Sequence, residues 1–439
     1  MGGKLSKRIS LSQSWTGESI LCCLCFLIAL KGLFIPVDLI FFRNELSQGL
    51  ILITTITGLF FLRKSKRETT LVPHALTLIG IYLAAHCLIS PQAALTNIRY
   101  GMYIIIIYLF LNRNIRIMPL FSKFAKCLAP YLALALILHS YLTMYSVDLQ
   151  GWSVDGLQVF ESNNDVYNKI MDDTVYYAPY YFVLVGEWFV YFGEFKWLRF
   201  TGYGPEPTDL AMLCVPLIFV CWHYLRQGQK KLLMPIIIFV ISIFASLSIA
   251  GILALTIGFL FVRIAPSSRN KTLYIIALIA LFMPIMVINK MGLFSSITEM
   301  KVSEFVYYTQ ELGLITNLST TSLFGAGIQS YDEGVERSYG FISILSKYGT
   351  AGFAVWVFLI VSIFNQFIKL WNNEKTKILA AGGIASLFLS LKGPDIVTIH
   401  LLLYYCMVAF EAKGQLVKNR YRANYQQQGY PSPVFRSIS

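Results

Sequence analysis

The chain has 439 residues, of which 56% are hydrophobic, 15% aromatic and only 13% charged, whereas soluble domains carry roughly 25% charged residues. This composition is that of an integral membrane protein, and it excludes a disordered chain, a coiled coil and a nucleic-acid-binding protein. The formal net charge is nevertheless +13, so the excess of positive charge needs an explanation from topology.

Apolar runs recur along the whole chain. A helix needs about 20 apolar residues to cross a bilayer, and twelve runs approach or reach that length. They predict an all-α polytopic membrane protein, a single transmembrane domain over residues 1–439, with spans at 20–42, 46–62, 71–90, 98–112, 127–146, 208–225, 232–248, 249–262, 272–289, 349–368, 378–391 and 396–410.

The basic residues gather in alternate connections between these spans and in both terminal segments. That side of the membrane receives 25 Lys and Arg and four acids, against ten basic and eighteen acidic residues on the other side. Because Lys and Arg are retained on the cytoplasmic side, both termini are predicted to be cytoplasmic. No cleavable signal peptide is evident, since Arg43 and Glu45 follow the first apolar run without a small-residue cleavage site.

Two connections on the predicted outer side are long, at 147–207 and 290–348. Loops of this length are usually functional or ordered. Within the first, the aromatic stretch from Tyr176 to Leu198 predicts an interfacial or re-entrant helix, because aromatic rings prefer headgroup depth; the alternative is a strip that only anchors the loop. The tail at 424–439 is predicted to be a disordered cytoplasmic tether.

The cysteines and histidines give no sign of a redox or metal centre. All eight cysteines lie in predicted spans, which favours packing over disulfides. No histidine has a Cys, His or carboxylate neighbour at ligand spacing, so neither a metal site nor a cofactor is predicted. The five histidines are His74, His86, His139, His223 and His400.

A charged pair stands where the first long loop meets the next span. Arg199 and Glu206 are seven residues apart, with Gly202, Pro205 and Pro207 among or beside them. Glycine and proline together predict a rigid turn that holds both charges near the membrane surface. Such a pair is suited to bind a diphosphate and to activate a hydroxyl, although an ion pair that merely holds the turn together is the alternative.

The end of the second long loop carries a similar accumulation of motifs. Leu323 to Ile328 contains two glycines, an acidic and basic cluster ending at Arg337 follows, and Tyr339 comes next before the glycines of Lys347 to Gly352. The glycine pair alone is a weak signal. Its position before charged residues at a span entrance strengthens it, while ordinary loop solvation would also explain the acids.

At this point the chain resembles the Wzy-type polymerases of bacterial O-antigen and exopolysaccharide, in the superfamily that also contains the O-antigen ligases. The topology is similar, with about twelve helices, cytoplasmic ends and two large periplasmic loops, and the resemblance implies a GT-C-like fold. The motifs that match are Arg199 to Ala211 with its Glu-Pro form, the Ser-rich helix break at Ser246 to Ile252, and the glycines at Leu323 to Gly327, Gly349 and Gly352.

Two departures from the family pattern bear on the function. The ligase branch usually has a histidine eleven residues before the first of the final glycines, and this chain has Ser338 there. The resemblance therefore favours a polymerase over a ligase. The arginine that the family carries in the helix break is also missing after Ser248, which weakens any transfer of function to that position.

The resemblance implies a metal-independent glycosyltransferase of the bacterial inner membrane with its active site facing the periplasm. Its substrates would be undecaprenyl-diphosphate-linked oligosaccharides and its further partners membrane lipids and a chain-length-regulating co-polymerase, without nucleic acid. Because a diphosphate is a good leaving group, the protein needs cations, a base and accurate positioning. The candidate catalytic residues are Glu206 as the base and Arg199 and Arg337 as cations, with Arg99, Tyr339, Gly202, Lys392 and Asp395 as candidate substrate-binding residues.

A flippase of lipid-linked sugars, or another secondary transporter, is an alternative with about as many spans. Transporters place ionisable residues near the middle of their spans. Here Lys31 and His139 are the main candidates for such positions, whereas the charged clusters lie in the predicted outer loops. This distribution favours chemistry at the membrane surface.

Overall fold

The structure of the chain is a computed structural model, and it describes residues 49, 52–53, 55–56, 71–91, 94–113, 118–145, 176–177, 185–186, 189–192, 195–202, 207–263, 323–325, 341–391, 398, 401–409 and 411. This part of the chain is mostly helical. The predicted spans at 20–42 and 272–289, most of the span at 46–62, most of both long loops and the tail at 424–439 lie outside the described residues.

The described helices coincide with predicted spans, although their ends differ by several residues. A further helical segment covers 401–409, within the span predicted at 396–410. The other helices are α4 (Leu71–Ile89), α5 (Ala94–Arg113), α6 (Met118–Met144), α8 (Pro207–Arg226), α9 (Leu233–Ala245), α10 (Ile249–Arg263), α14 (Phe341–Trp371) and α15 (Lys377–Ser390), joined before α9 by the short 3₁₀ helix η7 (Lys230–Leu232).

Four of the described helices are long and apolar enough to cross a membrane, at Leu71–Ile89, Phe121–Met144, Pro207–Arg226 and Lys347–Trp371. The helices at Ile249–Arg263 and Lys377–Ser390 are apolar but shorter. The prediction of a polytopic helical membrane protein is therefore supported for this part of the chain.

Two helices differ from the predicted spans in an informative way. Helix α6 begins at Met118, nine residues before the predicted start, so Lys123 and Lys126 lie in its first turns and not in a loop. Pro119 at the beginning of the helix has the fixed φ that a first turn requires. In α14 the backbone leaves the helical conformation at Gly349, where φ is +63°, so the span is preceded by a short helix that starts at Phe341.

The described residues of the aromatic stretch in the first long loop are strands and not helix, so the expectation of an all-α fold is wrong there. The described residues form two antiparallel hairpins, β1 (Tyr176–Tyr177) with β2 (Val185–Gly186) and β3 (Phe189–Phe192) with β4 (Phe195–Leu198). Aromatic and β-branched residues favour strands. Gly193 and Glu194 separate the paired Phe192 and Phe195, and a two-residue connection that begins with glycine is typical of a hairpin.

Helix α15 packs against three other helices, α8, α10 and α14, while α4 packs against α5 and α14. Glycines allow this close packing. The ring of Phe219 in α8 fills the space where a side chain on Gly258 in α10 or on Gly382 in α15 would stand. Small residues at helix contacts are the usual way in which membrane helices approach each other, so the core depends on one buried ring against two glycines.

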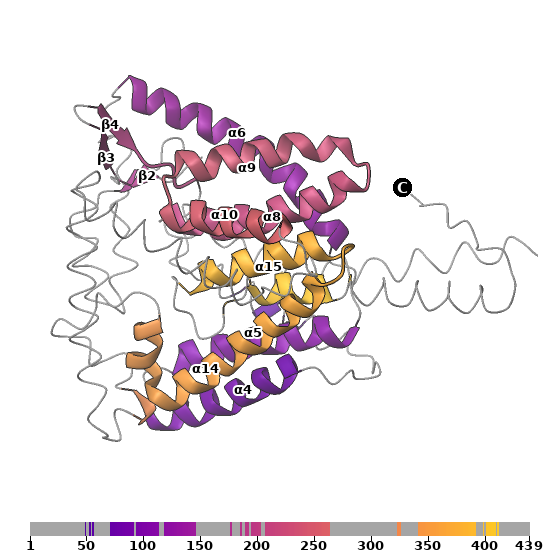
Figure 1. Cartoon of the computed structure of the whole chain (residues 1–439). Helices are drawn as coiled ribbons and strands as arrows, with labels where there is room; N and C mark the ends of the chain where they lie inside the picture. The colour runs from indigo at the N-terminus through magenta and orange to yellow at the C-terminus, as the bar shows by residue number, and fades with distance from the viewer. Residues whose placement is uncertain are drawn as a thin grey trace, which may run out of the picture.

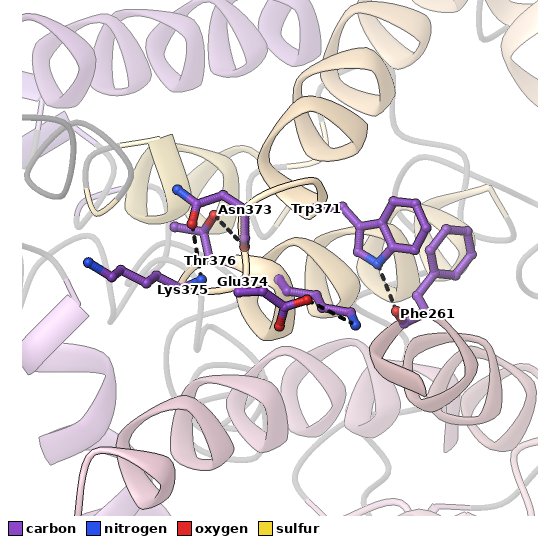
Figure 2. Close-up of polar contacts among 7 residues, drawn as sticks. Phe261, Trp371, Asn373, Glu374, Lys375 and Thr376 are labelled. Carbon is purple, nitrogen blue, oxygen red and sulfur yellow. Dashed lines mark hydrogen bonds and ion pairs between the residues drawn. The ribbon is translucent and has the colours of Figure 1, made fainter. Parts of the chain in front are cut away.

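Helices α10 and α14 have their C-terminal ends on the same side of the described bundle. At one end the indole Nε1 of Trp371, the last residue of α14, donates to the backbone oxygen of Phe261 near the end of α10 at 2.7 Å (Figure 2). The turn from α14 to α15 lies beside it, with Lys377 Nζ 3.7 Å from Glu374 Oε1. The starts of α10 and α14 consequently lie at the other end, toward the hairpins in Figure 1.

Candidate functional site

The segment that joins β4 to α8 is fastened to the end of α9. We call residues 197–202 the Arg199 turn. The indole Nε1 of Trp197 and the backbone N–H of Phe200 both donate to the backbone oxygen of Ala245, each at 3.2 Å. Phe200 is buried. The last residues of the first long loop are therefore held at the point where α9 ends.

Arg199 itself donates to two further carbonyls of the same helix end. Its Nε lies 3.1 Å from the oxygen of Ser246 and its Nη2 lies 3.3 Å from the oxygen of Leu247. The last carbonyls of a helix lack partners within the helix and carry partial negative charge. A guanidinium has several donors in fixed directions, so Arg199 is well suited to satisfy two of these carbonyls.

The break between α9 and α10 is built by two serines and one unusual backbone conformation. Leu247 has φ of +46°, a left-handed conformation that costs a residue with a Cβ about 1–2 kcal/mol. Ser246 Oγ donates to the oxygen of Ile243 at 2.7 Å, and Ser248 Oγ accepts from the N–H of Gly251 at 3.2 Å. A helix break is thus present at the start of the Ser246 to Ile252 stretch, with Ser248 capping α10.

The guanidinium of Arg199 reaches the break between α9 and α10 from another segment of the chain. This contact gives Arg199 a role in holding the fold. Whether it also binds a diphosphate stays a prediction, as does the substrate-binding role of Gly202.

Gly202 ends the described part of the turn with φ of +65°. A Cβ at this position would lie 3.2 Å from Leu210 Cδ1 and 3.5 Å from Leu132 Cδ2. Glycine is the residue that adopts this conformation without strain. Helix α8 then begins at Pro207, with Asp209 in its first turn, where a negative charge is favourable.

His139 of α6 borders the Arg199 turn on another side. Its ring lies 5.2 Å from the ring of Phe200 in an edge-to-face arrangement and 6.4 Å from the ring of Trp197. The residue is only 2% exposed. Among the described residues, its Nε2 has no hydrogen-bond partner, and a buried polar atom of this kind is uncommon in native proteins.

A second cluster forms where the end of the second long loop meets α4 and α5. We call it the His86 junction, made of Tyr82, His86, Asn97 and residues 323–325 and 347–349. His86 Nε2 lies 3.1 Å from the oxygen of Phe324 and His86 Nδ1 lies 3.0 Å from Asn97 Nδ2. The Tyr82 hydroxyl donates to the oxygens of Phe324 and Tyr348.

The two loop segments in this junction touch through glycines. Gly325 has φ of +82° and Gly349 has φ of +63°. A Cβ on Gly325 would lie 2.7 Å from the Gly349 nitrogen, and one on Gly349 would lie 2.5 Å from the Leu323 oxygen. Because both positions need a left-handed backbone and an open side, only glycine fits.

Of the candidate site residues, Arg99, Arg199 and Gly202 lie in the described part of the chain. Arg99 is in α5, two residues after Asn97, and its guanidinium carbon lies 5.4 Å from the centre of the Tyr100 ring. It is therefore close in sequence to the His86 junction, whereas Arg199 and Gly202 belong to the other cluster. The remaining candidates lie outside the described residues: Glu206, Arg337, Tyr339, Lys392 and Asp395.

Sequence reasoning missed the neutral polar residues of both clusters. No histidine had a Cys, His or carboxylate neighbour at ligand spacing, so His86 was assigned no role and His139 was named only as a deep residue for the transporter alternative; Asn97 and Tyr82 were not among the candidates. Their partners come from distant parts of the chain, so ligand spacing carries no signal. Polar residues inside a predicted span are the one sequence feature that could have identified them.

No protein-family model, no curated protein and no solved structure matches this chain. In the part of the chain that the structure describes, no group of three His, Cys, Asp or Glu side chains is arranged to hold a metal ion. The function must therefore be argued from the residues and their geometry.

Proposed function

We propose that the protein is a polymerase of undecaprenyl-diphosphate-linked oligosaccharide repeat units in the bacterial inner membrane. In this proposal it has about twelve spans, cytoplasmic termini and two large periplasmic loops at 147–207 and 290–348. The growing glycan leaves its lipid diphosphate and joins the hydroxyl at the non-reducing end of the incoming lipid-linked unit. The proposal rests on the sequence resemblance and on one structural observation.

That observation is that the two motif-bearing segments lie at the same end of the bundle. The Arg199 turn contacts the break between α9 and α10, and the His86 junction contacts the start of the span in α14. The ends of α10 and α14 meet on the opposite side, through Trp371 and Phe261. A reaction that uses both long loops at one membrane surface needs this arrangement.

The proposed glycosyl transfer requires a cation at the leaving diphosphate and a base at the acceptor hydroxyl. In the proposed mechanism Arg199, Arg337 and Arg99 supply guanidinium groups, which bind phosphate oxygens in a bidentate manner. Glu206 takes the proton of the hydroxyl. Tyr339, Gly202, Lys392 and Asp395 line the substrate, and no cofactor takes part.

The decisive test is reconstitution of the full chain with lipid-linked repeat units. A ladder of longer lipid-linked products supports the polymerase. Product found on lipid A core and never on a second lipid-linked repeat would instead indicate a ligase, and movement of the lipid-linked unit across the bilayer without longer products would indicate a flippase.

The role of Glu206 is tested by Glu206→Gln, which has nearly the same shape but cannot take up the proton. A positioned base contributes about 10² to 10⁴ in rate, so turnover should fall by this factor while donor binding persists. If Glu206 only orients a neighbouring cation, the variant keeps near-normal turnover, because glutamine can still hydrogen-bond. Asp332, Glu333 and Glu336 would then be the next candidates for the base.

The proposed topology is tested by cysteine-accessibility labelling in intact cells. Cysteines introduced beside Asp165 and Glu311, one in each long loop, should react with an impermeant reagent from outside. If these cysteines react only when the reagent can reach the cytoplasmic face, the predicted orientation in the membrane is reversed and the proposal is contradicted.

A further inference from the structure

The hydrogen bonds of His86 define the state of its ring. Asn97 Nδ2 is a donor, so His86 Nδ1, 3.0 Å away, accepts from it. The oxygen of Phe324 is an acceptor, so His86 Nε2, 3.1 Å away, carries the proton and donates. With the Asn97 amide in this orientation, the ring is neutral and both of its nitrogens are engaged.

This engagement argues against a role for His86 in proton transfer. A general base needs a lone pair directed at the substrate, and the lone pair of His86 is directed at Asn97. A metal ligand needs neighbours with the same chemistry, and the described residues around His86 are two tyrosines, an asparagine and backbone carbonyls. What remains is the effect of the ring on the backbone that it binds.

That backbone belongs to two segments that come from either side of residues 326–346. His86 donates to Phe324 on one side, and its ring lies 5.2 Å from the ring of Tyr348 on the other. Tyr82 donates to Phe324 and to Tyr348. The side chains of α4 thus bridge both segments, while the glycine contact between Gly325 and Gly349 keeps them close together.

The His86 junction is buried in an apolar bundle, which raises the free-energy cost of losing one of its hydrogen bonds. His86 is 1% exposed and Asn97 is 2% exposed. A buried polar group without its partner costs about 1–3 kcal/mol. The hydrogen bonds therefore have one favoured arrangement, and that arrangement defines the spacing between the two segments and α4.

We propose that His86 is a positioning residue: with Asn97 behind it and Tyr82 beside it, it holds the two segments that flank residues 326–346 at one spacing against α4 and α5. Residues 326–346 include the candidate site residues Arg337 and Tyr339. The effect on catalysis rests on the proposed function, whereas the effect on spacing does not. Asn97 acts through the ring, because its amide fixes the nitrogen that carries the proton.

The test compares two polar substitutions that differ in reach. In His86→Gln, the amide nitrogen reaches the position of Nε2 and can still donate to Phe324. In His86→Asn, the shorter side chain reaches only the position of Nδ1, so the contact with Phe324 is lost. The pair is matched in polarity, and neither variant introduces an apolar group.

We expect turnover in His86→Asn to fall by about 10²-fold, the loss typical of a small misplacement of reacting groups, and His86→Gln to recover most of it. The KM for the lipid-linked donor should change less than the turnover. The exposed His74, in the same helix α4, is the control, and His74→Asn should keep normal turnover. Equal turnover in wild type and His86→Asn would overturn the positioning role.

A spacing measurement makes the test independent of activity. Spin labels are placed at Leu88 in α4 and at Leu323, which are 86% and 44% exposed, in a background without other reactive cysteines. We expect a narrow distance distribution in the wild type and in His86→Gln, and a broad one in His86→Asn. An unchanged distribution in His86→Asn would overturn the proposal, even if the chain made no polymer; absence of polymer from wild type alone would overturn the proposed function.

Discussion

The Arg199 turn and the His86 junction perform the same structural task with different chemistry. Each ties the end of a long predicted loop to helix ends by donating hydrogen bonds to backbone oxygens. The Arg199 turn uses a guanidinium and an indole against the end of α9. The His86 junction uses an imidazole and a phenol against the oxygens of Phe324 and Tyr348, with the Asn97 amide donating to the imidazole.

The difference follows from what each cluster must satisfy. The last carbonyls of α9 point in one direction and carry the negative end of the helix dipole, which a cation complements. The carbonyl of Phe324 lies in the segment 323–325, and that of Tyr348 lies directly before the kink of α14 at Gly349. Neutral donors on rigid rings suit them, because a charge buried there without a partner of opposite sign would be costly.

The two histidines of these clusters sharpen the contrast. Both are almost completely buried, yet His86 has partners at both ring nitrogens, whereas His139 Nε2 has none in the part of the chain that the structure describes. A fully bonded group rigidifies its surroundings. We therefore assign His86 to positioning and draw no role for His139 beyond its contact with the Arg199 turn.

The largest loss of stability should come from Gly349→Ala, which disturbs the backbone of the His86 junction. A left-handed alanine costs about 1–2 kcal/mol, and forcing a Cβ against the Leu323 carbonyl adds about 1–3 kcal/mol. We expect the free energy of unfolding in SDS to fall by both amounts. Gly101→Ala is the control, since nothing lies within 4 Å of a Cβ there, and a similar loss in both variants would contradict the close contact.

A smaller loss is expected from Arg199→Lys, which tests the other cluster. Lysine keeps the charge but cannot donate to Ser246 and Leu247 with the same rigid fork. Loss of one hydrogen bond from a charged group costs about 1.5–3 kcal/mol, so the unfolding free energy should fall by this amount. Exposed Arg226 supplies the control Arg226→Lys. Unchanged stability together with lost donor binding would show that Arg199 serves the substrate alone.

The opposite end of the bundle provides a reference through Trp371→Phe. The substitution keeps an aromatic ring against Phe261, which it meets edge to face, but removes the hydrogen bond to the Phe261 oxygen. We expect a loss of about 1 kcal/mol, measured by the same unfolding assay, and normal turnover. A strong loss of turnover would mean that function does not depend chiefly on the two clusters.

The smallest effect is expected from Leu247→Gly in the helix break. Glycine relieves the left-handed strain of about 1–2 kcal/mol but gives up the contacts of a partly buried side chain. These effects oppose each other, so stability should stay within about 1 kcal/mol of the wild type. Leu255→Gly, inside α10, should cost clearly more, because Leu255 is 4% exposed and glycine is unfavourable in a helix.

The sequence predicted the helices much better than the first long loop, at 147–207. Spans at 71–90 and 208–225 agree closely with α4 and α8, because a run of apolar residues bounded by charges is a local signal. The aromatic stretch before Leu198 was assigned to an interfacial helix or an anchoring strip, and its described residues form paired strands instead, since aromatic residues favour strands as well as the membrane interface.

The candidate site was predicted in the same uneven way. Arg199 stood out because a charge beside glycines and prolines is visible within a few residues. His86 did not, because Asn97 lies in the next helix and its other neighbours, Phe324 and Tyr348, are remote in the chain. A charged residue in an apolar sequence can be recognised from its neighbours along the chain. The role of a neutral hydrogen-bonding residue depends on the partners that lie beside it after folding.

The sequence by itself determined that this is a helical membrane protein, because burial of apolar helices depends on composition and on runs of about twenty residues. It also indicated the break between α9 and α10, since the serines there bind nearby backbone through their own hydroxyls. Only the tertiary structure decided which carbonyls receive Arg199 and His86, and that the two loop ends gather at one end of the bundle. Those contacts join segments far apart in the chain, and their energy depends on burial and geometry that no local pattern contains.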